Sequence, residues 1–227
     1  MTRRLLLVRH GVTDWNREGR FQGHQDPALS DEGVAEARLL AQRLVATLGD
    51  GPLRIATSPL ARARRTAELI VEALDGSGRH VKLETDARLV EVGQGEWEGR
   101  THADLLVADA ERYAAWRRSD SDRQPPGAEP LVEVMARIAA CLEERTPAQD
   151  ESTCLVSHGG TLRLLARLVL DLPPRRAWAL DLDNASLSIL SQSDDGPWRL
   201  ERWNDARHLL GHMQVHVDES DGEPLAF

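Results

Sequence analysis

The chain has 227 residues, 41% of them hydrophobic and 29% charged, so it is long enough for one large domain and apolar enough to bury a sizeable core. Its formal net charge is −9 at pH 7 with the 8 His residues counted as neutral, and so acidic a chain lacks the basic footprint that nucleic-acid binding requires. We therefore expect no nucleic-acid partner, and any anionic ligand must be captured by a local cluster of arginines.

The cysteines and the apolar runs indicate the compartment. Cys141 and Cys154 form no CxxC pair and have no metal-like spacing, so we expect two buried, reduced thiols. The N-terminal apolar run at 5–8 is too short for a signal peptide or a membrane span, and no later segment approaches the length of a span. These features predict a soluble, cytoplasmic protein without a membrane partner.

Strand-like and helix-like apolar patterns alternate along the chain. Short apolar runs predict strands at 5–8, 53–58, 81–83, 153–158, 185–190 and 198–203. A helical spacing of apolar residues predicts helices from Ser30 as N-cap to Gly49, from Ser58-Pro59 to Leu74, and over 101–118, 131–144 and 161–170. The segment 88–99 is rich in Gly and Glu and indicates a loop.

This alternation predicts an α/β fold, a three-layer α/β/α sandwich around a central, mostly parallel mixed sheet. We expect a single domain over 1–227, with a helical and loop excursion around 95–130 and a mobile acidic tail at 218–227. We interpret the polar connector at 119–130 as part of the excursion, because the same alternation resumes after it. The last two predicted strands could pair across a homodimer.

Three of the predicted strands lead into side chains that bind or attack phosphate. The first ends in Arg9-His10-Gly11, the second leads into a helix with Arg62 in its first turn, and the 153–158 strand ends in His158-Gly159-Gly160. Ligands of open α/β sheets bind beyond the carboxyl ends of the strands, so we expect these side chains to meet. Guanidiniums form forked hydrogen bonds to phosphate, and neutral imidazole can attack phosphorus. A single strand-end His is more often structural, but the convergence predicts a phosphate site.

A metal site is a second enzymatic possibility. His24 with Asp26, and His102 with Asp104, could supply ligands. Their spacings match no strong metal-binding pattern, and carboxylates are common in so acidic a chain. We therefore expect no metal dependence and no cofactor.

Five segments together resemble the histidine phosphatase superfamily, in its phosphoglycerate mutase-like branch. They are "LVRHGVTDWN", "FQGHQDPALSDEG", "SPLARARRTA", "RLVEVGQGEWEG" and "LVSHGGTLR", and they follow one another in the family's order over roughly 5–190. Together they are far more specific than an RHG tripeptide alone. The resemblance implies the phosphoglycerate mutase-like fold and phosphoryl transfer through a phosphohistidine.

The resemblance also implies roles for individual residues. His10 would be the nucleophile, Arg9, Arg62 and His158 would bind the phosphoryl oxygens, and Glu91 would protonate the leaving oxygen and then activate water. The family uses matching positions around the substrate, here Thr13, Asn16, Gln22, Gly23 and Gly159. For Asn16 and Gln22, ordinary turn chemistry is an equally good interpretation.

Two activities and one inactive state remain open for such a site. Cofactor-dependent mutases of the family carry a long insertion before the second His, whereas this chain has only "DSDRQPPGAEP" and one helix there. Gly160 follows Gly159 as in the phosphatases, and "PPGAEP" resembles their Pro-Gly-Gly-Glu-Ser segment with departures at Ala128 and Pro130. We therefore predict a phosphomonoesterase that acts on a small phosphorylated metabolite. The alternatives are a cofactor-dependent phosphoglycerate mutase and a non-catalytic phosphate-binding relative.

Overall fold

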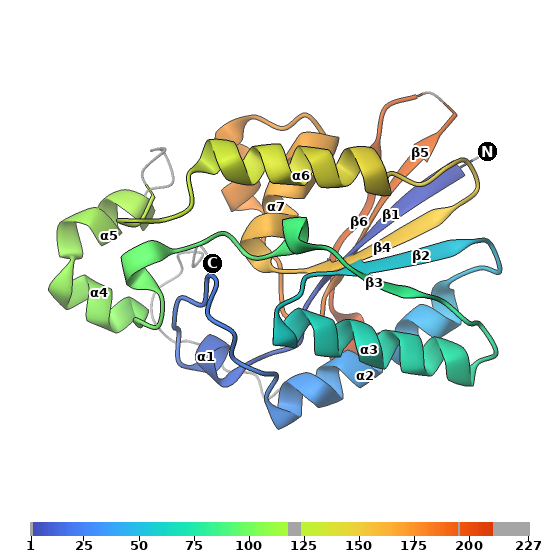
Figure 1. Cartoon of the computed structure of the whole chain (residues 1–227), viewed down its shortest axis with the longest axis horizontal. Coiled ribbons are helices and arrows are strands. Elements are labelled where there is room, and N and C mark those ends of the chain that lie inside the picture. Colours follow the sequence, from blue (N-terminus) through green and yellow to red (C-terminus); the bar gives the residue numbers. More distant parts are fainter. Residues whose placement is uncertain (1, 118–123, 195, 211–227) are drawn as a thin grey trace.

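The computed structural model describes residues 2–117, 124–194 and 196–210. Within them one sheet has the strand order β3-β2-β4-β1-β5-β6 (Figure 1). The strands are β1 (Thr2–Arg9), β2 (Leu53–Thr57), β3 (Leu83–Thr85), β4 (Ser152–Ser157), β5 (Leu187–Ser193) and β6 (Arg199–Asp205). The pairs β1–β4, β2–β4 and β2–β3 are parallel, while β5 is antiparallel to both β1 and β6. The sheet is therefore mixed and mostly parallel, as predicted.

Helices cover both faces of this sheet. They are α1 (Asp14–Arg17), α2 (Asp31–Thr47), α3 (Ala61–Gly76), α4 (His102–Ala108), α5 (Ala110–Arg117), α6 (Leu131–Arg145) and α7 (Gly159–Val169). Short 3-10 turns are η1 (Ala87–Leu89), η2 (Gly95–Trp97), η3 (Pro174–Ala179) and η4 (Arg207–Leu209). In Figure 1, α6 and α7 lie on one side of the sheet and α2 and α3 on the other, which confirms the three-layer α/β/α sandwich.

Strand β1 contributes to the cores on both faces, which explains its unbroken apolar sequence. Leu5 and Leu7 point into the core shared with α6 and α7, and Leu6 and Val8 point into the core shared with α2 and α3. All four side chains are at most 2% exposed. Because successive side chains of a strand alternate in direction, this burial fixes the orientation of the residues that follow β1.

The start of α3 differs from the prediction. Ser58 is not the N-cap: the helix begins at Ala61, and Leu60 is the N-cap residue without a side-chain hydrogen bond. The Ser58 hydroxyl instead forms a hydrogen bond of 2.8 Å with Nε2 of His158. A residue that resembles a helix cap is thus part of the strand-end cluster.

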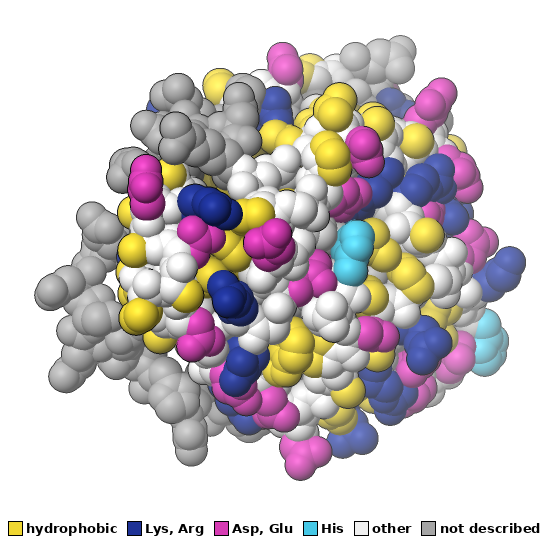
Figure 2. Space-filling view, turned by 60° about the vertical axis from the view of Figure 1, so that its left-hand side comes forward, with side chains coloured by type: hydrophobic (Ala, Val, Ile, Leu, Met, Phe, Trp, Pro, Cys, Tyr) yellow, Lys and Arg dark blue, Asp and Glu magenta, His cyan; other side chains and the backbone are white. Residues whose placement is uncertain are grey.

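The predicted helix over 101–118 is two helices, α4 and α5, separated at Asp109. Thr101 caps α4 through a capping box with Asp104. Asp109 accepts a hydrogen bond of 3.0 Å from the indole of Trp97, which ties the break to η2. In Figure 1, α4 and α5 extend beyond the sheet, and the face turned forward in Figure 2 mixes hydrophobic side chains with both signs of charge.

Two further expectations concern the termini and the thiols. The tail at 218–227 and the connector residues 118–123 lie outside the described residues. Cys141 and Cys154 are free and buried, and burial raises the pKa of each thiol to about 12. Among the described helices, none is both long enough and apolar enough to span a membrane.

Candidate active site

The two strand-end histidines lie side by side. Because β4 pairs with β1 in parallel register, with Ser157 opposite Arg9, the residues that follow the two strands meet at one edge of the sheet. The ring centroids of His10 and His158 are 5.1 Å apart. His10 is 3% exposed and His158 is 0% exposed. The predicted meeting of two imidazoles is therefore observed.

His10 is held in one tautomer. Its Nδ1 lies 2.7 Å from the carbonyl oxygen of Gly11, which can only accept, so Nδ1 carries the proton. Burial, followed by the charges of Arg62 and Arg9, lowers the pKa of His10 well below its ordinary value. The ring is thus neutral near pH 7, and no described residue forms a hydrogen bond with its Nε2. A neutral imidazole with a free Nε2 is a competent nucleophile.

His158 holds Arg62 in place. Nε of the Arg62 guanidinium donates to Nδ1 of His158 at 3.2 Å, so the His158 proton is on Nε2, which donates to Ser58. Burial and the charge of Arg62 lower the pKa of His158 well below its ordinary value. The remaining Arg62 nitrogens donate to the carbonyls of Gln25 at 2.7 Å and Gly23 at 3.0 Å. Arg62 is 0% exposed, and burial lowers its pKa to about 10.

Two further arginines, Arg9 and Arg163, lie close to Gly159. The Arg9 guanidinium donates to the carbonyl of Leu182, and its buried Nε has no hydrogen-bond partner among the described residues. Arg163 on α7 is 3% exposed and donates to the carbonyl of Leu180 at 2.6 Å. Burial and the charge of Arg9 lower the pKa of Arg163 to about 10, so it remains a cation near pH 7. Arg163 was not among the predicted site residues.

Glu91 lies against the N-terminus of α7. Its carboxylate accepts hydrogen bonds from the backbone N–H groups of Val92 at 2.8 Å, Gly160 at 3.1 Å and Thr161 at 3.0 Å. Helix N-termini stabilise negative charge, and here they fix the position of one specific carboxylate. The segment 88–91 is thereby attached to the same helix that follows His158.

A partly buried ion pair between α6 and the segment before it also holds this acid-bearing segment. The Arg137 guanidinium on α6 donates to the carbonyls of Arg88 at 2.7 Å, Val90 at 2.9 Å and Glu91 at 3.2 Å. The same guanidinium forms two hydrogen bonds with Glu129, at 2.7 and 3.0 Å, and Glu129 accepts from the N–H of Gly93 at 3.2 Å. We call Arg137 and Glu129 the acid-loop clamp.

The loop after His10 packs directly on the start of α2. The backbone of Gly11 approaches the carbonyl of Gly33 so closely that a Cβ on Gly11 would overlap it. A Cβ on Gly33 would in turn overlap the carbonyl of Val12, and that carbonyl accepts from Ser30 N–H at 3.1 Å. Glycine is needed at both positions because of close approach.

The predicted substrate-binding set is only partly at the pocket. Asn16, Gln22 and Gly23 line it, whereas Thr13 and Gly159 do not. Thr13 is fully buried and forms a capping box with Asn16 at the start of α1. Asn16 thus takes part in the capping box and also lines the pocket, so the two interpretations of this residue are compatible. A Cβ on Gly159 would come within 3.2 Å of the Arg163 side chain and 3.5 Å of the Arg9 side chain, so glycine leaves room for both guanidiniums.

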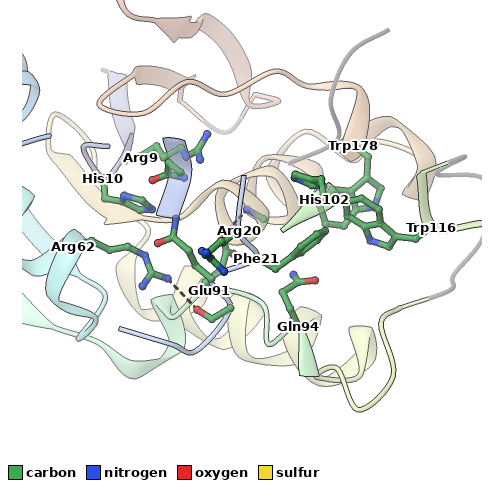
Figure 3. Close-up of a pocket in the computed structure, with 14 residues that line it drawn as sticks. Arg9, His10, Arg20, Phe21, Arg62, Glu91, Gln94, His102, Trp116 and Trp178 are labelled. Atoms are coloured by element: carbon green, nitrogen blue, oxygen red, sulfur yellow. Dashed lines mark hydrogen bonds between the residues drawn. The ribbon is translucent and has the colours of Figure 1, made fainter. Parts of the chain in front are cut away.

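One pocket joins these groups, with about 670 Å³ of empty space including its open mouth (Figure 3). Besides predicted residues, it is lined by Arg20, Phe21, Gln94, His102, Gly160, Trp116 and Trp178. In Figure 3, Arg9, His10, Arg62 and Glu91 lie at one end, and Phe21, His102, Trp116 and Trp178 lie at the other. We call these two ends the phosphate end and the aromatic wall.

The residues considered as metal ligands have other contacts. His24 Nε2 donates to the carbonyl of Glu91 at 3.0 Å, and Asp26 accepts from the N–H of Ala61 at 2.6 Å. His102 Nδ1 is 2.8 Å from the Tyr113 hydroxyl, and Asp104 belongs to the α4 capping box. Within 2–117, 124–194 and 196–210, no group of three or more His, Cys, Asp or Glu residues could hold a metal ion.

The family model described as "Histidine phosphatase superfamily (branch 1)" matches residues 5–206. The chain is 31% identical to Phosphoserine phosphatase 1 from Hydrogenobacter thermophilus, over 84% of this chain and 87% of the relative. It is 38% identical to Probable phosphoglycerate mutase GpmB from Klebsiella pneumoniae, over 90% and 94%. A mycobacterial glucosyl-3-phosphoglycerate phosphatase solved in complex with VO3 matches with a TM-score of 0.75 and 36% identity, covering 89% of this chain and 98% of that one. This chain belongs to the histidine phosphatase superfamily.

Proposed function

We propose that this protein is a phosphomonoesterase that hydrolyses a small phosphorylated metabolite through a phosphohistidine at His10. The observation that carries the proposal is the state of His10: a neutral ring whose Nδ1 proton is engaged by the Gly11 carbonyl, beside Arg62 and Arg9. A neutral nucleophile surrounded by fixed cations suits attack on a phosphate dianion. Relatives named as phosphatases support the same activity.

The first half-reaction transfers the phosphoryl group to the protein. Nε2 of His10 attacks phosphorus while the bond from phosphorus to the ester oxygen breaks, and protonated Glu91 gives its proton to the departing alcohol. Arg9 and Arg62 offset the charge on the non-bridging oxygens. His158 orients Arg62 through the hydrogen bond at Nδ1, so its part in binding includes positioning that guanidinium.

The second half-reaction restores the free protein. Glu91, now a carboxylate, accepts a proton from a water molecule as the water oxygen attacks the phosphohistidine and the phosphorus–nitrogen bond breaks. Inorganic phosphate leaves, His10 returns to its neutral state, and Glu91 is protonated again. The hydrogen bonds from α7 and the acid-loop clamp hold Glu91 in one place for both steps.

The experiment is release of phosphate from a panel of phosphomonoesters by the wild type and by His10→Ala. We expect turnover by the wild type and a loss of at least about 10⁴-fold in His10→Ala, as for removal of a nucleophile. Retention of activity in His10→Ala, with an unchanged circular dichroism spectrum, would contradict the proposal. A wild type that binds phosphate tightly but hydrolyses no ester would indicate the non-catalytic alternative.

The mutase alternative has its own assay. The substrate 3-phosphoglycerate is mixed with a catalytic amount of 2,3-bisphosphoglycerate, and both 2-phosphoglycerate and inorganic phosphate are measured. We expect phosphate to be the main product, because water must reach a phosphohistidine in an open pocket. Predominant formation of 2-phosphoglycerate would instead assign the chain to the activity for which its Klebsiella relative is named.

A further inference from the structure

The aromatic wall has no part in the phosphoryl-transfer steps. Its residues come from four separate segments: Phe21 from the loop after α1, His102 from α4, Trp116 from α5 and Trp178 from η3. Figure 3 shows them grouped away from His10, at the end of the pocket where the remainder of an ester would lie. The side chains of the wall are thus placed to contact the alcohol half of the substrate.

A second layer of aromatic rings supports three residues of the wall, Phe21, His102 and Trp116. Phe21 lies 4.7 Å from His102 and 5.2 Å from Trp116, measured between ring centroids. Trp97 is 1% exposed and meets both Phe21, at 5.5 Å, and Trp116, at 5.7 Å, edge to face. Tyr113 is 2% exposed and stacks on Trp116 at 5.8 Å. A surface supported in this way loses little side-chain entropy when a ligand binds.

The wall is also poorly suited to a negatively charged alcohol. Among the lining residues that the structure describes, Arg20 is the cation outside the phosphate end, and it already pairs with Glu18 and donates to the Gly99 carbonyl at 2.7 Å. Burial, followed by the charge of Arg117, lowers the pKa of His102, so that ring is neutral near pH 7. Arg117 itself does not line the pocket, so a carboxylate placed here would lose hydration while the lining cation beside it, Arg20, already has acceptors.

The polar groups beside the wall include acceptors that a hydrogen-bond donor on the ligand could satisfy. The Gln94 side chain donates from Nε2 to the carbonyl of Val92 at 3.3 Å, which leaves its buried Oε1 without a partner in the described part of the chain. The buried Oε1 of Gln22 is likewise without a partner among the described residues. Unpaired buried acceptors are satisfied by a donor on a ligand and repel a carboxylate.

From these observations we propose that the substrate is the phosphomonoester of an uncharged alcohol that carries an aromatic or heteroaromatic ring, with the ring stacked against Phe21 and Trp116. The inference rests on the proposed function and makes it more specific. Small anionic esters such as phosphoglycerate can react at the phosphate end, but they gain nothing from the wall.

The test compares esters whose leaving groups are similarly basic, so that differences in the rate of bond breaking do not distort the comparison of binding. The probes are 2-phenylethyl phosphate, n-propyl phosphate and 3-phosphoglycerate, all esters of aliphatic alcohols. We expect the kcat/KM for the phenylethyl ester to exceed that for each of the other two by about tenfold, the typical gain from one buried aromatic contact. A ratio near one, or a preference for 3-phosphoglycerate, would overturn the inference.

Variants then locate the preference. Trp116→Ala and Trp116→Leu should both lower the ratio of phenylethyl to propyl ester toward one, and the Leu variant keeps apolar volume in case the Ala variant folds poorly. The matched control is Trp198→Ala: Trp198 is also half-buried, but it lies beside Arg3 and outside the pocket. An unchanged ratio in both Trp116 variants would contradict the proposed stacking.

Binding measured without turnover separates this inference from the proposed function. In His10→Ala, equilibrium titration with intact 2-phenylethyl and n-propyl phosphate should give affinities that also differ by about tenfold. A binding preference in a wild type that releases no phosphate would support the aromatic wall and contradict the phosphatase activity. Turnover of both esters without a binding preference would support the phosphatase activity and contradict the role of the aromatic wall.

Discussion

The two ends of the pocket are built in different ways. At the phosphate end, His10 and His158 follow adjacent strands, and Glu91 is fixed by backbone N–H groups of α7. At the aromatic wall, Phe21, His102 and Trp116 are placed by their contacts with one another. The backbone of the sheet and of α7 thus positions the proposed reacting groups, whereas side-chain packing around α4 and α5 shapes the space proposed for the alcohol. Chemistry and selectivity can therefore vary independently.

The largest difference between the ends should appear in Arg62→Ala. We expect kcat/KM to fall by about 10²–10³ for the phenylethyl and propyl esters alike, because both place the same phosphate beside this cation. The matched control is Arg64→Ala on the same helix, where the side chain is 57% exposed and pairs with Glu68. A loss confined to one of the two esters would show that the phosphate end also selects the alcohol.

A smaller effect is expected from the acid-loop clamp, which contacts the backbone of Glu91 but does not line the pocket. Arg137→Ala removes the donors to three carbonyls of the Glu91 segment, so Glu91 should be misplaced while phosphate binding continues. We expect kcat to fall by about 10- to 100-fold for both esters with little change in KM. Arg137→Lys should recover only part of the lost kcat, since an ammonium group cannot form the several hydrogen bonds of the forked guanidinium.

Two controls accompany the Arg137 variants. Glu143→Ala changes an exposed residue of α6 and should have the kinetics of the wild type. A melting curve shows whether loss of the ion pair with Glu129 unfolds the chain. Equal loss of kcat and of phosphate affinity in a folded Arg137→Ala protein would contradict a positioning role.

The smallest effect concerns the dependence of stability on pH. The folded pKa of His10 lies well below its ordinary value near 6.5, so between the two the unfolded chain binds a proton that the folded chain does not. The free energy of unfolding must therefore decrease as the pH falls through this window. In His10→Ala the slope below pH 6.5 should be smaller, by at most about 1.4 kcal/mol per pH unit, which is the limit for one proton.

Denaturant titrations at several pH values measure this slope. Above about pH 7.5 both forms of the chain hold His10 neutral, so the two proteins should differ there by a constant amount. Parallel stability curves down to pH 5 would mean that His10 titrates normally in the folded chain. That outcome would contradict a lowered pKa of His10 at the phosphate end of the pocket.

The sequence predicted the phosphate end better than the wall, for physical reasons. Arg9, His10 and His158 follow short buried strands, and parallel strands bring their carboxyl ends together. Glu91 has no such signal, since it is one loop carboxylate among 37 acidic residues, and only the resemblance to the family selected it. Phe21, Trp116 and Trp178 show no common period because they come from three separate segments, the loop after α1, α5 and η3, which meet only in the folded chain.

Two residues had signals that could have been used. Arg163 interrupts a helix whose first eight residues are all buried, and a cation in such a segment implies buried carbonyl partners or a bound anion. Ser58 precedes a proline, which indicated a helix cap. The same hydroxyl faces His158 at the end of β4, and the hydrogen bond between them competes with capping.

The close approach of Gly11 and Gly33 makes the loop after His10 depend on the first turn of α2 for its position. No α2 side chain lines the pocket, yet any side chain at position 33 would push against the loop that orients the nucleophile. A substitution there would reduce turnover while leaving every group that touches the substrate chemically intact. Random mutagenesis should therefore find inactivating changes at this position, which lies outside the pocket, as well as at the proposed reacting residues.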